Sequence, residues 1–131
     1  MPASPIARLR RLCLALPEAV EVETWETPTF RVRGRIFALV GSHGDAPAVW
    51  LKAPPGAQEL LLAVDPARFF RPPYLGGRGW IGVVLSGSTD WAEVDALVRR
   101  SFSLIAPRRV AARVATPDAP APATRRGAGS R

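Results

Sequence analysis

Side chains that usually carry catalysis or bind metals are scarce in this sequence. Its 131 residues include one cysteine, Cys13, and one histidine, His43. A lone cysteine cannot form an internal disulfide, which favours a reducing compartment such as the cytoplasm. A zinc site needs three or four ligands of the His, Cys or Asp type, and this pair is too small a set. We therefore expect no metal site, and we expect a protein that is not an enzyme.

Long apolar runs are also missing. No stretch of about 18 apolar residues occurs, so we expect no membrane-spanning helix. Residues 1–16 mix arginines into their apolar positions, whereas a signal peptide places its charges first and then an unbroken apolar stretch. These absences again favour a cytoplasmic protein.

Basic residues are abundant, and they are unevenly spread. The net charge is +7, and Lys52 is the only lysine among the 18 basic residues. Residues 107–131 hold six arginines and one aspartate, a net charge of +5, which leaves +2 for the other 106 residues. We interpret most of the charge as belonging to a basic tail, which weakens the charge argument for nucleic-acid binding.

The residue pattern predicts one domain over residues 1–114 and a disordered tail rich in proline, alanine and arginine over 115–131. Ser4 and Asp90 are placed to cap helices near 4–16 and 90–106, and a short helix fits 56–64. Alternating or apolar segments predict strands near 19–25, 30–33, 35–40, 48–52 and 80–85. Gly34 marks a tight hairpin turn between two of them. We expect an α+β two-layer sandwich, with a mainly antiparallel sheet that carries its helices on one face.

A glycine-rich segment at Gly77–Gly82 matches the dinucleotide-binding spacing GxGxxG. That fingerprint needs a preceding strand and a following helix whose first turn holds the pyrophosphate. Here the glycines lead into a predicted strand, and Trp80 stands where a phosphate would have to approach. We therefore expect no bound cofactor.

Several segments together resemble the MmcQ/YjbR-like family in their order and spacing. They are Leu16-Pro17-Glu18, the run Thr27–Ala38 with its Pro-x-Phe strand and glycine turn, Leu51-Lys52, Tyr74-Leu75, Arg78-Gly79-Trp80 and Ser101-Phe102. The resemblance covers residues 5–114. It implies a frataxin-like (CyaY-like) fold and DNA binding, which is how the family is commonly described. Thr27 stands where many members have a histidine, so no role of that histidine transfers.

The acidic residues near the first predicted strand invite comparison with the iron-binding ridge of frataxins. They are Glu18, Glu21, Glu23 and Glu26. The frataxin ridge has more carboxylates on its first helix, where this chain carries three arginines. We interpret these glutamates as a solvated strand face.

Cations on the predicted sheet form the candidate nucleic-acid site. Arg31 and Arg33 alternate with apolar residues on one strand, and Arg35 follows the Gly34 turn. Such cations beside an aromatic side chain suit phosphate contact with base stacking. The candidate site residues are Arg31, Arg33, Arg35, Lys52, Arg78 and Trp80. The competing interpretation is that Arg31 and Arg33 pair with Glu21 and Glu23 across adjacent strands, which would neutralise this face.

Two functions follow from these expectations. The first is a monomeric, non-enzymatic protein that binds DNA weakly and without sequence preference, through the basic strand, the hairpin and the tail. The second is an adaptor that binds a protein or small ligand on the open sheet face, using Trp80.

Overall fold

The computed structural model describes residues 4–114, so the predicted tail over 115–131 lies outside the described residues. Within these residues, six strands and four α-helices follow one another in an order typical of an α+β protein. In chain order the elements are α1 (Pro5–Leu14), β1 (Val20–Thr24), β2 (Thr27–Val32), β3 (Arg35–His43), β4 (Ala46–Leu51), α2 (Ala57–Val64), β5 (Phe69–Phe70), the 3-10 helix η1 (Gly76–Arg78), β6 (Ile81–Val84), α3 (Trp91–Ile105) and α4 (Arg108–Ala111).

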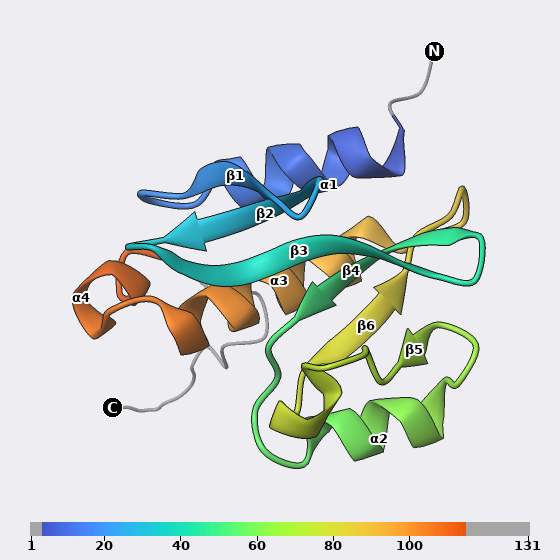
Figure 1. Ribbon diagram of the computed structural model, residues 1–131. Coiled ribbons are helices and arrows are strands. Elements are labelled where there is room, and N and C mark those ends of the chain that lie inside the picture. The colour runs from blue at the N-terminus through green and yellow to red at the C-terminus, as the bar shows by residue number, and fades with distance from the viewer. Residues whose placement is uncertain (1–3, 115–131) are drawn as a thin grey trace.

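The strands form one antiparallel sheet in the order β1-β2-β3-β4-β6-β5. Helices α1 and α3 lie behind this sheet in the view of Figure 1, while α2 lies at its β5 end. The predicted fold class, with the two long helices on one face of an antiparallel sheet, is confirmed.

The long helices begin at the predicted caps. The Ser4 side chain accepts a hydrogen bond from the first turn of α1 at 3.1 Å, and Asp90 does the same for α3 at 3.1 Å. Their apolar stripes face the sheet, where the Phe102 ring meets Phe37 edge-on at a centroid distance of 5.1 Å. Burial of these stripes, more than helix propensity, stabilises helices of this length.

A buried serine joins α3 to the centre of the sheet. The Ser101 hydroxyl donates to the Phe37 carbonyl at 2.5 Å and accepts from the Lys52 backbone N–H at 2.9 Å. One side chain therefore satisfies a donor and an acceptor at neighbouring points on β3 and β4, which fixes the helix against those strands.

Strand register defines the two faces of the sheet. Cross-strand partners share a face, and the helix-covered face carries the row Glu21, Phe30, Ala38, Leu51 and Ile81. The opposite face carries the row Val22, Thr29, Leu39, Trp50, Gly82 and Phe70. The apolar core lies between the first row and the helices.

The structure differs from the predicted elements in three places. The strands predicted near 35–40 and 48–52 are longer in the structure, where β3 and β4 continue to a two-residue turn at Gly44 and Asp45. Residues 69–79, for which we predicted no helix or strand, contain β5 and η1. Helix α4 follows Pro107, beyond the last helix that we predicted. The Gly77–Gly82 segment runs from η1 into β6, so no helix follows its glycines.

No helix in the described range is long and apolar enough to cross a membrane.

Candidate anion-binding surface at the β2–β3 hairpin

A two-residue turn places Arg33 at the tip of the β2–β3 hairpin. Arg33 and Gly34 both have positive φ, 52° and 80°, as the tight turns that suit twisted strands require. The prediction of a turn at Gly34 is confirmed. The prediction that Arg33 continues the strand is wrong, because this turn needs two central residues and Arg33 is the first of them.

Glu18 pairs with Arg33 at this tip. The Arg33 Nη2 lies 3.1 Å from Glu18 Oε2, and a second arginine, Arg113, approaches the same oxygen at 3.2 Å. The hydrogen bond from Arg33 is the main cause that holds the pKa of the Glu18 carboxyl below its ordinary value, and the Arg113 charge adds to it. The predicted pairing of Arg33 with Glu23 is therefore wrong.

Arg31 extends over the opposite face from Glu21, so their predicted pairing is also wrong. Its guanidinium donates to the Thr24 hydroxyl at 2.9 Å and to the Thr29 hydroxyl at 3.2 Å. Glu21 is the cross-strand partner of Phe30, on the helix-covered face, and pairs with Arg10 of α1 at 2.7 Å. Register places the two charges on opposite sides of the sheet, where they cannot meet.

The other predicted site residues do not gather in one place. Arg35 is exposed at the start of β3, next to the hairpin tip. Lys52 is half-buried just beyond the end of β4, and Arg78 is exposed in η1. Trp80 is only 6% exposed and belongs to the core, so its ring does not lie on an open surface for stacking.

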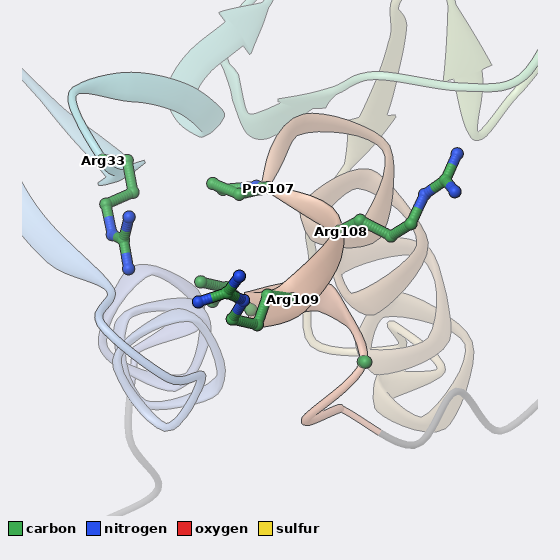
Figure 2. A pocket seen from close by; sticks show the side chains of 6 residues that line it. Arg33, Pro107, Arg108 and Arg109 are labelled. Atoms are coloured by element: carbon green, nitrogen blue, oxygen red, sulfur yellow. The ribbon is translucent and has the colours of Figure 1, made fainter.

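Helix α4 brings further arginines to the hairpin tip. In Figure 1 this helix lies beside the point where β2 turns into β3. A depression of about 620 Å³ lies between them, lined by Arg33, Pro107, Arg108, Arg109, Val110 and Ala112. Figure 2 shows the Arg109 guanidinium turned toward Arg33 and the Arg108 guanidinium turned away. No ion pair in the described chain engages Arg35, Arg108 or Arg109.

Helix α4 places three arginines in the folded part of the chain and not in the tail. We assigned Arg108, Arg109 and Arg113 to a basic tail, but they lie in or directly after a helix that packs its Val110 into the core. Residues 4–114 hold 15 basic and 10 acidic residues, a net charge of +5. The interpretation that most of the charge belongs to the tail is therefore wrong. The sequence signals for this helix are Pro107 at its start and the apolar Val110 between arginines and alanines.

The sheet face away from the helices carries aromatic side chains. The Trp50 indole lies against Gly41, where an added Cβ would stand 2.5 Å from the ring. His43 stacks on Phe70 with a centroid distance of 4.3 Å. Residues 4–114 contain no group of three or more His, Cys, Asp or Glu side chains able to hold a metal ion.

These features define a class of small α+β proteins with an antiparallel sheet, helices on one face and a basic hairpin end. A family model described as YjbR matches residues 14–104, and the chain belongs to that family. Escherichia coli K12 YjbR, named an uncharacterized protein, is 31% identical over 103 residues, which cover 74% of this chain and 83% of the relative. The YjbR of Escherichia coli O157:H7 matches equally.

A solved structure supports the same family assignment. The crystal structure of Deinococcus radiodurans protein DR2400, with the domain DUF419, superposes with a TM-score of 0.69 at 27% identity. The match covers 79% of this chain and 80% of that one. The fold described above is therefore shared with an experimentally determined relative.

Proposed function

We propose that this protein binds DNA without catalysis, by contacting backbone phosphates through the basic end that the β2–β3 hairpin and α4 form. The observation that carries the proposal is the set of exposed arginines there that have no carboxylate partner within residues 4–114: Arg35, Arg108 and Arg109. Arginine suits this role because its planar guanidinium matches the geometry of phosphate oxygens.

Phosphate contact of this kind does not read base sequence. Side chains that reach only phosphate oxygens position a protein on a duplex, while base edges must be contacted for sequence preference. Trp80 is buried, so its ring is not available to stack on a base, and we propose weak binding without sequence preference.

Salt dependence tests the proposal quantitatively. Each phosphate contact contributes about 0.9 to the slope of log affinity against log salt. The variants Arg35→Ala and Arg108→Ala should each lower that slope by about 0.9, measured by fluorescence anisotropy with a labelled duplex. Arg71→Ala is the matched control, because it removes an equal charge just after β5, at the opposite edge of the sheet. An equal decrease of the salt slope in all three variants would contradict the proposal, as would a wild-type protein with no affinity for the duplex at low salt.

The adaptor function is the second candidate, and one observation favours it. Val20 and Val22 of the edge strand β1 are 52% and 40% exposed. Both lie on the face that also carries Trp50. Binding that is insensitive to salt and is lost on replacing these valines by threonine would favour the adaptor over the DNA-binding protein.

A further inference from the structure

The depression at the hairpin tip is open to solvent and is lined by basic and apolar side chains. Its volume of about 620 Å³ falls within the usual range for ligand pockets, about 300–1,000 Å³. Pro107 and Val110 contribute apolar wall, and the Arg109 guanidinium turns toward the side on which Arg33 lies (Figure 2).

Charge is unbalanced around this depression. Arg33, Arg108 and Arg109 line it, and no acidic side chain does. Glu18 is shared between Arg33 and Arg113, and no ion pair within residues 4–114 engages Arg109. An anion that enters the depression therefore meets the Arg109 guanidinium and one guanidinium, Arg33, that shares a single carboxylate charge with Arg113.

We propose that this depression binds a phosphate monoester, and that the monoester displaces Glu18 from Arg33. The inference rests on the proposed function and makes it more specific: the ligand is a terminal phosphate group, such as a nucleic-acid end. A monoester carries a charge of about −1.5 to −2 at neutral pH and three acceptor oxygens. It can therefore replace the single charge of Glu18 on Arg33 and pair with Arg109 at once. An internal phosphodiester carries one charge, no more than the Glu18 carboxylate that it would replace, so we expect it to bind less tightly.

A pair of oligonucleotides tests the preference. A single-stranded ten-nucleotide DNA with a 5′-phosphate should bind the full chain at least tenfold more tightly than the same DNA with a 5′-hydroxyl. Titrations followed by NMR should shift the Arg33 and Arg109 side-chain N–H signals with the first ligand. Inorganic phosphate should shift the same signals, which would show that the phosphate group itself is recognised. Equal affinity for both oligonucleotides would overturn the proposal.

Two substitutions test the assigned residues. Arg109→Ala should abolish the preference for the 5′-phosphate, while Arg71→Ala should keep it. Glu18→Gln should tighten binding of the phosphorylated oligonucleotide, because the competing charge on Arg33 is removed. Weaker binding by Glu18→Gln, with an unchanged thermal midpoint, would show that the ligand does not displace Glu18 from Arg33 and would overturn the displacement that we propose.

Failure here and failure of the proposed function are distinguishable. Salt-dependent duplex binding without any 5′-phosphate preference would keep the DNA-binding proposal and reject the monoester site. The protein could instead bind inorganic phosphate and the phosphorylated end but have no affinity for a duplex with only 5′-hydroxyl ends. That result would keep the monoester site and reject the proposal that the protein binds DNA through backbone phosphates.

Discussion

At the scale of single residues, Cys13 shows how burial decides chemistry. It lies on the inner side of α1 and is completely buried among core residues such as Leu9 and Leu16. Burial is the main cause that raises the pKa of the Cys13 thiol, and the negative charge of Glu21 adds to it. The thiolate is the reactive form of cysteine, so a thiol held protonated in this way is inert.

A thiol reagent should therefore not modify the folded protein. We expect no reaction of Cys13 with Ellman's reagent over an hour at pH 8, and one equivalent of reaction in concentrated guanidinium chloride. Because the raised pKa keeps the thiol neutral above the pH at which an ordinary cysteine ionises, increasing the pH to 9 should change little. Rapid reaction of the native protein would mean that α1 detaches readily from the sheet.

Caps were predictable from the sequence, whereas ion-pair partners were not. A cap depends on residues three positions apart, as for Ser4 and the first turn of α1, and such local spacing is visible in the sequence. The partner of Arg33 depends on which residues a turn brings together. Glu18 lies 15 residues away, in the connection between α1 and β1. Arg113, which donates to the same Glu18 carboxylate, lies 95 residues from Glu18, a separation that no local sequence pattern reveals.

At the scale of elements, the contact between β5 and β6 depends on a glycine. Phe70 of β5 lies directly over Gly82 of β6, where an added Cβ would stand 2.2 Å from the ring. No real Cβ approaches an aromatic carbon so closely, so the ring or the short strand would have to move.

Gly82→Ala should destabilise the fold by about 1–3 kcal/mol, the usual cost of overpacking a filled site. Chemical denaturation followed by tryptophan fluorescence measures this loss. Gly87→Ala is the matched control, since a Cβ there meets no atom within 4 Å and the residue lacks a positive φ. If the two variants were equally stable, Phe70 would have room to turn away and the contact would not fix β5.

Helix α4 was beyond the reach of periodicity because it has only four residues. An apolar stripe needs several turns to be recognised, and the predicted end of the last long helix near residue 106 is confirmed, since α3 ends at Ile105. The proline also begins the next helix, as its N-cap. Long elements with strong patterns were therefore predictable, and the short helix that completes the candidate site was not.

At the scale of the whole molecule, antiparallel pairing followed from the sequence but strand order did not. Successive segments with tight turns predict neighbours, and β1 to β4 pair in that way. The last strand, β6, lies between β4 and β5, an arrangement that depends on long-range packing. Gln58 of α2 helps to fix this end, because its amide donates to the carbonyls of Gly76 and Trp80 at 2.8 and 2.6 Å.

The left-handed conformation of Arg33 implies that folding stability alone would favour another residue at this position. Asn-Gly is the preferred pair for such a turn, and arginine is a poor first residue there. Arg33→Asn should leave the thermal midpoint unchanged or higher, because exposed ion pairs such as the one with Glu18 contribute little to stability. A lowered midpoint would contradict the expectation for stability. The same variant should also bind phosphate less tightly. Stability and the proposed phosphate binding would thus favour different residues at the tip of the β2–β3 hairpin.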